Sequence, residues 1–203
     1  DAVTEVHQVL VGAGQTDAIT NMARSLQSSL RSLGPSEIFA QHPAPGITDV
    51  QHLSSFPKTS SRSRVVIFHA SGGDPEVFKF LQNSGDPLVL IFHNIAPPEL
   101  FENFAPDRAA LLRKGWDELS SLREKVTLSI ADSKYNAQCL EKIGYQNIVV
   151  LPAGAQANRL HNHKSDVDMK RLLERETVGP LLLYVGQALP HKRPEVLVQM
   201  QYL

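Results

Sequence analysis

Short apolar runs alternate with segments of helical spacing along most of the chain, and this alternation constrains the fold most strongly. The apolar runs are nearly continuous, as in strands that are buried on both faces of a parallel sheet. Helices between them supply the crossovers that parallel strands require. The sequence therefore predicts an α/β protein with a Rossmann-like, doubly wound parallel sheet. The predicted strands lie at 6–11, 37–40, 65–68, 88–92, 127–131, 148–151 and 181–186.

The predicted helices lie at 19–33, 75–81, 98–104, 106–124, 135–143 and 169–176. Residues 43–64 are rich in Pro, Ser and Gly, so they are predicted to form mostly loop. A buried strand at 181–186 would need neighbours that the remaining residues cannot supply. We therefore expect the chain to be a fragment of a longer protein, with an N-terminal domain at 1–165. Residues 166–203 would hold a linker and the first strand-helix unit of a second, truncated domain.

The composition narrows the classes of partner. With 20 Lys+Arg against 21 Asp+Glu, the formal net charge is −1, which argues against nucleic acid as the main partner. The single Cys139 excludes an internal disulfide and fits a reducing compartment, and no apolar run is long enough for a membrane span. We expect a cytoplasmic protein. A peripheral contact with the inner face of the membrane stays open, although acidic residues nearly cancel the basic charge of the helix at 106–124.

Small and polar residues follow the predicted strands, where a doubly wound sheet binds its ligands. Gly12, Gly14 and Gln15 lie between the first strand and its helix, where backbone N–H groups and the helix dipole can hold a phosphate. A dinucleotide fingerprint would need a small residue at position 17, where the sequence has Asp17. The competing interpretation is a tight turn in which Asp17 caps the helix.

Two neighbouring strands of the sequence each end in a histidine. His93 directly follows the strand at 88–92, so its imidazole could donate to a sugar hydroxyl or share a proton. A histidine that only caps the sheet through a carbonyl is the alternative. His69 and Ser71 follow the preceding strand, and with Asn94 they are candidates for binding an acceptor. The glycines after Ser71 could equally form a turn whose aspartate caps the next helix.

The predicted strand at 181–186 is followed by a loop and a helix start that carry Gln187 and Lys192. A lysine there could neutralise a diphosphate as a point charge. A solvated basic surface is the alternative, because Arg193 is adjacent and Glu195 could pair with either. His161 and His163 lie in a polar stretch without nearby Cys, so no metal site is predicted.

Together these segments resemble the GT-B glycosyltransferases, specifically the large retaining family 4. The glycine loop, the strand that ends in His93, the Ala131-Asp132-Ser133 segment and the strand and loop that lead to Lys192 carry the resemblance. It implies transfer of a sugar from a nucleotide-diphosphate sugar to a carbohydrate, lipid or small-molecule acceptor, with retained configuration. It also implies catalysis without a metal or other cofactor.

The resemblance assigns roles to several residues. His93 would orient the sugar, while Lys192 and the helix start after Gly14 would stabilise the diphosphate leaving group. The family usually has Arg where this sequence has Gln187, so the donor site would carry less positive charge. The two glutamates of the family's acidic motif would lie beyond Leu203, so we expect the fragment alone to be nearly inactive.

Two other functions stay open from the sequence. One is a nicotinamide-dependent oxidoreductase or a nucleotide-sugar epimerase, against which stand Asp17 and the lack of a convincing ribose-binding acid after the second strand. The other is a non-catalytic module that binds a sugar or a partner.

Overall fold

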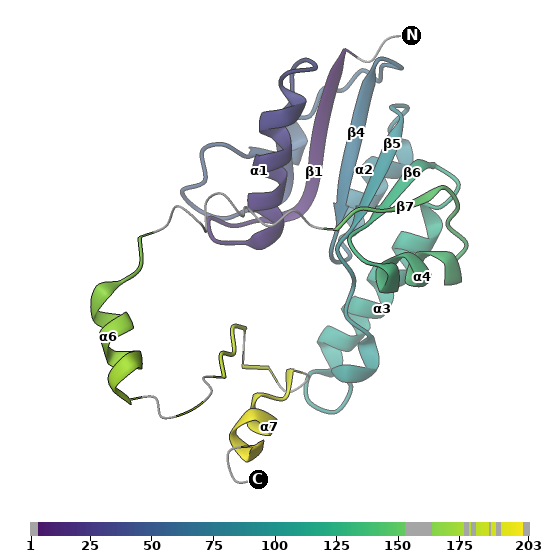
Figure 1. Ribbon diagram of the computed structural model, residues 1–203. Coiled ribbons are helices and arrows are strands. Elements are labelled where there is room, and N and C mark those ends of the chain that lie inside the picture. Colours follow the sequence, from purple (N-terminus) through teal and green to yellow (C-terminus); the bar gives the residue numbers. More distant parts are fainter. Residues whose placement is uncertain are drawn as a thin grey trace. The chain divides into compact units, whose positions relative to one another are not determined.

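The computed structural model describes residues 4–152, 164–176, 179, 182–186, 188–189 and 192–200. The chain divides into two compact units, Asp1–Ala153 and Gly154–Leu203. The first unit is an α/β fold in which a parallel sheet is flanked by helices, which confirms the predicted fold class (Figure 1). Within the described residues, no helix has both the length and the apolar character that crossing a membrane requires.

All pairings in the sheet are parallel. Among the described residues the sheet has seven strands in the order β3-β2-β1-β4-β5-β6-β7. The chain builds outward from β1 to β3 and then returns to β4 on the other side of β1. The topological switch point, where such sheets bind ligands, therefore lies between β1 and β4. The strands are β1 (Glu5–Ala13), β2 (Ile38–Pro43), β3 (Gln51–His52), β4 (Arg64–Ala70), β5 (Leu88–Phe92), β6 (Val126–Ala131) and β7 (Ile148–Val150).

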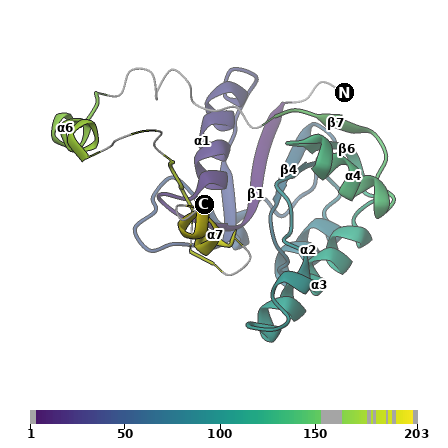
Figure 2. The same ribbon diagram turned by 60° about the horizontal axis from the view of Figure 1, so that its bottom comes forward.

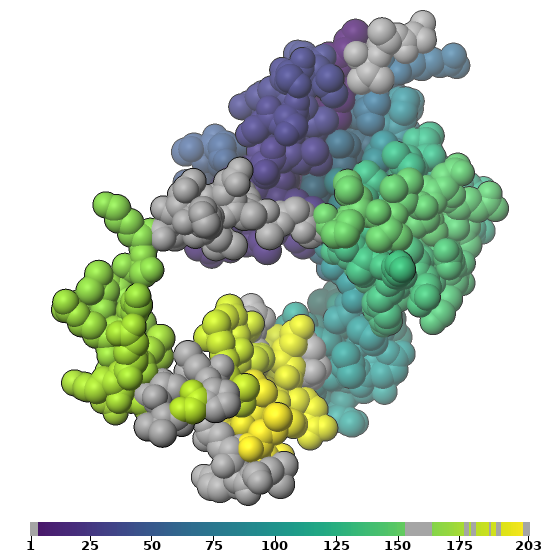
Figure 3. Space-filling model, in the orientation of Figure 1, coloured from purple at the N-terminus to yellow at the C-terminus, as the bar shows by residue number. Residues whose placement is uncertain are grey.

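Helices cover both faces of the sheet, as Figures 1 and 2 show. On one face α1 packs its buried Ala23 near Leu10 and Ile38. On the other face lies the main core, which includes Phe78 of α2 and Leu119 of α3. In the space-filling view, α1 and α4 form parts of the outer surface of this unit (Figure 3). The helices are α1 (Ala18–Leu30), α2 (Pro75–Asn83), α3 (Pro106–Ser121) and α4 (Lys134–Lys142), with short 3-10 turns η1 (Leu53–Ser55) and η2 (Pro98–Leu100).

Three α-helices of the first unit begin at side-chain caps. Asp17 accepts the N–H of Thr20 at 2.7 Å at the start of α1. Asp74 accepts two N–H groups at the start of α2, and Ser133 accepts one at the start of α4. These caps confirm the capping interpretations for Asp17 and Asp74. Each one satisfies backbone donors that a helix start would otherwise leave without partners.

The stretch predicted as mostly loop contains a short strand and a turn of helix. Gln51 and His52 form β3, which pairs in parallel with Phe39 and Ala40 of β2. Leu53 of η1 and Phe56 are buried, so apolar anchors hold this stretch against the sheet. Periodicity gave no signal because β3 is two exposed polar residues long. The sheet therefore has one more edge strand than the sequence predicts.

The second unit contains α6 (Val167–Glu176) and α7 (Pro194–Gln199). The helix predicted at 169–176 is confirmed. The buried strand predicted at 181–186 is wrong for residues 182–185, which form no strand and of which Leu183 is 82% and Val185 85% exposed. Apolar composition alone does not make a strand, because a strand needs a partner for its backbone groups. Among the residues described in this unit, no strand offers that pairing.

Candidate functional site

A pocket of about 460 Å³ lies at the switch point of the sheet. Its walls come from the carboxyl ends of β1 and β2, from the loops that follow β1 and β4, and from the first turn of α1. Gly12 and Gly14 line it, and so does Ser71, so the structure brings these three predicted residues together. The full lining is Leu10, Val11, Gly12, Ala13, Gly14, Asp17, Ile19, His42, Ser71 and Gly72.

The glycine loop uses its own polar groups to build the start of α1. The N–H of Gly14 donates to the hydroxyl of Thr20 at 3.1 Å, and this hydroxyl donates to the carboxylate of Asp17 at 2.8 Å. That N–H already has an acceptor, and Asp17 brings a negative charge to the pocket. The pocket wall therefore suits hydroxyl groups better than a phosphate, and phosphate binding by Gly12 and Gly14 stays a prediction.

Two other predicted residues follow strand ends of the same sheet. Gln15 is exposed, and its carbonyl accepts a hydrogen bond from Arg24 at 3.3 Å. Asn94, directly after β5, is half-buried and has a φ of 76°, in the left-handed region that asparagine tolerates better than most residues. The structure gives neither side chain a contact that would assign it to donor or acceptor.

A buried row of polar side chains crosses four strands or strand ends beside this pocket. The amide of Gln8 on β1 lies 2.8 Å from Nε2 of His69 on β4. Nδ1 of His69 lies 2.9 Å from Nε2 of His93, which directly follows β5. Nδ1 of His93 faces Asp132 at the end of β6, with 3.8 Å between Nδ1 and Oδ2. Together with Asn136, which donates to Asp132 at 2.5 Å, these residues form what we call the strand-end row.

Burial sets the charge of the two histidines. His69 is 0% exposed, and burial, together with the charge of His93, lowers the pKa of His69 to about 3. Burial also lowers the pKa of His93, although the carboxylates of Asp132 and Asp17 act in the opposite direction. Both rings are therefore neutral at pH 7. The glycine loop follows β1 and His93 follows β5 in the same parallel sheet, so both lie at the same edge of the sheet.

His69 lies within β4, not after the strand as the sequence predicts, whereas His93 directly follows β5 as predicted. With no exposed surface, His69 cannot touch an acceptor in this structure; it contacts His93 instead. The imidazole of His93 is itself only 6% exposed, whereas 23% of the Asp132 side chain is exposed. Asp132 is therefore the most accessible of these three side chains, and a ligand would reach His93 from the side of Asp132.

Sequence reasoning missed Gln8 and His42. A glutamine within an otherwise apolar strand was the available signal for Gln8, which is completely buried. His42 lies in β2 and lines the pocket, and its Nε2 is 2.8 Å from Oδ2 of Asp74. It lies two residues past the predicted strand at 37–40, and that position was the available signal.

Of the two donor-site residues predicted in the second unit, Lys192 lies within the described residues. The side chain of Lys192 is exposed, and its backbone N–H donates to the carbonyl of Leu189 at 2.9 Å. Arg193 pairs with Glu195 at 3.0 Å. Gln187, His161 and His163 lie outside the described residues. Within the residues that are described, no group of three metal-binding side chains comes together.

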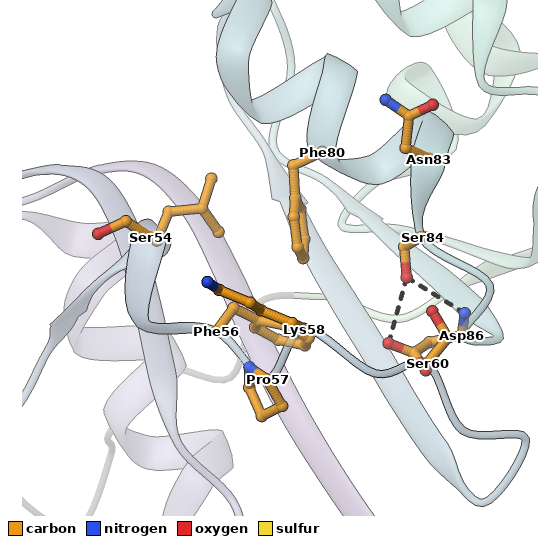
Figure 4. Close-up of a pocket in the computed structure, with 10 residues that line it drawn as sticks. Ser54, Phe56, Pro57, Lys58, Ser60, Phe80, Asn83, Ser84 and Asp86 are labelled. Carbon is orange, nitrogen blue, oxygen red and sulfur yellow. Dashed lines mark hydrogen bonds between the residues drawn. The ribbon is translucent and has the colours of Figure 1, made fainter.

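A second pocket, of about 310 Å³, lies between the segment after β3 and the last turn of α2. Figure 4 shows the rings of Phe56 and Phe80 at this pocket. Ser84 donates to the carboxylate of Asp86 at 3.1 Å and accepts its N–H at 3.1 Å. Asp86 precedes β5, so this pocket is at the amino ends of the strands, away from the strand-end row.

No protein-family model matches the chain, and no curated protein matches it either.

Proposed function

We propose that this chain is the acceptor-side part of a retaining GT-B glycosyltransferase of family 4, which moves a sugar from a nucleotide-diphosphate donor. One observation carries the proposal: a pocket at the switch point of a parallel sheet lies beside a strand-end histidine that is paired with a carboxylate. The pocket would hold the acceptor, and His93 with Asp132 would hold a sugar hydroxyl. Ligands of this fold class bind at this edge.

The charges of the site support a sugar better than a dinucleotide. A pyrophosphate at the start of α1 would meet Asp17 and would compete with Thr20 for the N–H of Gly14. Hydroxyl groups can donate to Asp17 or His42 without that repulsion. In this proposal the diphosphate is held by basic groups of the second unit, with Lys192 as the candidate and no metal involved. If the acceptor is a lipid, the protein would contact the membrane surface peripherally.

The test is the release of nucleoside diphosphate from a panel of nucleotide-diphosphate sugars by the full-length protein. His93→Ala should lower the release rate by about 10²-fold or more, the usual range for a positioned acid or base. His52→Ala is the matched control, because His52 is exposed and contacts only its own turn. An unchanged rate in folded His93→Ala would contradict the role of His93.

Two binding measurements address the other functions. Titrations with UDP, GDP and NAD(H) should show binding of a nucleoside diphosphate and none of NAD(H). Tight binding of NAD(H) would replace the proposal with the oxidoreductase or epimerase. Binding of a sugar without release of nucleoside diphosphate from any donor would favour the non-catalytic module.

A further inference from the structure

Gln8 has a fixed orientation because of what surrounds it. The side chain is 0% exposed, in the middle of β1. Its Nε2 lies 2.9 Å from the carbonyl oxygen of Ala23 in α1. A carbonyl can only accept, so this nitrogen must be the donor and Oε1 of Gln8 must face His69. The amide therefore offers an acceptor, and nothing else, to the histidine.

This acceptor decides which nitrogen of His69 carries the proton. Nε2 of His69 lies 2.8 Å from Oε1 of Gln8, so Nε2 must be the protonated, donating nitrogen. A neutral imidazole has one N–H, and burial keeps His69 neutral. Its Nδ1 is therefore unprotonated and accepts a hydrogen bond from His93 across 2.9 Å. The two rings are parallel to within 2°, which lets the N–H lie in the plane of the accepting ring.

The hydrogen bond to His69 decides the tautomer of His93 in the same way. Its Nε2 must donate to His69, so in the neutral ring Nδ1 is unprotonated. Nδ1 faces a carboxylate oxygen of Asp132 across 3.8 Å, a distance too long for a hydrogen bond. The other oxygen of Asp132 accepts from Asn136, which holds the carboxylate in place. Two hydrogen-bond acceptors thus face each other across a gap that contains no donor from this row.

We propose that Gln8 is a positioning residue that acts through His69 to keep Nδ1 of His93 unprotonated and facing the carboxylate of Asp132. The gap then takes a hydrogen-bond donor, either a ligand hydroxyl or a single proton. A fully ionised phosphate, which offers acceptors only, does not fit there. The inference rests on the proposed function only in naming the donor as a sugar hydroxyl; the proton positions follow from the free protein.

Uptake of a proton at Nδ1 would give His93 a positive charge, so the charged groups around the ring affect how easily it is protonated. The groups that face His93 are Asp132 after β6, Asp17 at the start of α1 and His69 on β4. Both carboxylates favour the protonated ring, whereas burial disfavours it. Removing the charge of Asp132 should therefore lower the pKa of His93 further.

Long-range ¹H–¹⁵N correlation spectra of the ¹⁵N-histidine-labelled chain test this inference without any substrate. At pH 7.5 both His69 and His93 should show a protonated Nε2 and an unprotonated Nδ1. In Gln8→Met, which has similar volume but no polar group, both rings should switch to the Nδ1-protonated form, because Nε2 of His69 then has no acceptor and a proton on Nδ1 of His93 faces the carboxylate of Asp132. Gln8→Glu keeps an acceptor and should keep the original tautomers.

The result for the unmodified chain is decisive even if a variant fails to fold. Detection of a protonated Nδ1 on neutral His93 would overturn the inference, and so would unchanged tautomers in folded Gln8→Met. Asp132→Asn gives a second measurement, in which the pKa of His93 should fall; an unchanged or higher value would contradict the pairing with Asp132. None of these outcomes depends on the sugar-transfer assay, so failure of one proposal is distinguishable from failure of the other.

Discussion

Gly73 and Gly115 lie in direct backbone contact, which fastens the loop after β4 to α3. A Cβ added to Gly73 would lie 2.5 Å from Cα of Gly115, and one added to Gly115 would lie 2.9 Å from the N of Gly73. Neither contact can be relieved by turning a side chain, because both involve backbone atoms. The absence of a Cβ at both positions therefore sets the place of the loop that carries Ser71 and Asp74.

Gly115→Ala should destabilise the protein although it raises helix propensity. Propensity favours Ala over Gly inside a helix by about 1 kcal/mol, whereas overpacking costs about 1–3 kcal/mol. Backbone cannot move aside cheaply, so we expect a net loss that urea denaturation will measure. Leu111→Ala in the same helix is the control, because Leu111 is 66% exposed and should change the free energy of unfolding little. Equal or greater stability of Gly115→Ala would contradict this contact.

The strands were predictable where burial on both faces leaves an uninterrupted apolar run. The strand predicted at 88–92 matches β5, and five further strands were found with shifted ends. β3 was missed because its two exposed residues carry no such pattern. Residues 182–185 of the strand predicted at 181–186 show the reverse case, in which an apolar run has no partner strand among the described residues.

The site was predictable only in part, for a related reason. His93 was found because it directly follows a strand, and the strand-end rule needs only the sequence. The link from Gln8 to His69 depends on β1 lying next to β4, and this neighbour relation comes from the sheet order. Gln8 lies opposite Ile67 in the register, and His69 opposite Leu10. No spacing along the sequence reveals that diagonal contact.

Arg64→Met should lower the free energy of unfolding by about 3–5 kcal/mol, the usual effect of breaking a buried ion pair. Arg64 donates to Glu5 at 2.8 Å and lies 3.6 Å from Oδ2 of Asp86, whose side chain is 2% exposed. Removal of the guanidinium leaves that carboxylate buried without its cation. Urea denaturation measures the loss, and Arg62→Met at an exposed neighbouring position is the control. A loss as small as that of the control would show that Arg64 contributes little.

Asp74 should make the free energy of unfolding depend on pH in the acidic range. Burial raises the pKa of Asp74, but hydrogen bonds from His42 and from the N–H groups of Val77 and Glu76 outweigh it, so the pKa is lowered. A lowered pKa in the folded state contributes stability above the unfolded value of about 3.9, and this contribution is lost as pH falls through the folded pKa. The difference in unfolding free energy between the unmodified protein and Asp74→Asn should therefore shrink from pH 6 to pH 3. A difference that stays constant over this range would contradict the assignment.

The proposed function predicts that Lys192→Ala in the full-length protein raises the KM for the nucleotide-diphosphate sugar and leaves the KM for the acceptor unchanged. Lys192 is exposed, so its ammonium is free to meet a diphosphate as a point charge. The competing interpretation is a basic surface without a specific role, and Arg193→Ala separates the two. Arg193 carries the same charge one position further on, but it pairs with Glu195 at 3.0 Å. Steady-state kinetics with both substrates should show a larger donor effect for Lys192→Ala. Equal changes in the donor KM for the two variants would favour the nonspecific surface. A change confined to the acceptor KM would show that Lys192 does not bind the donor.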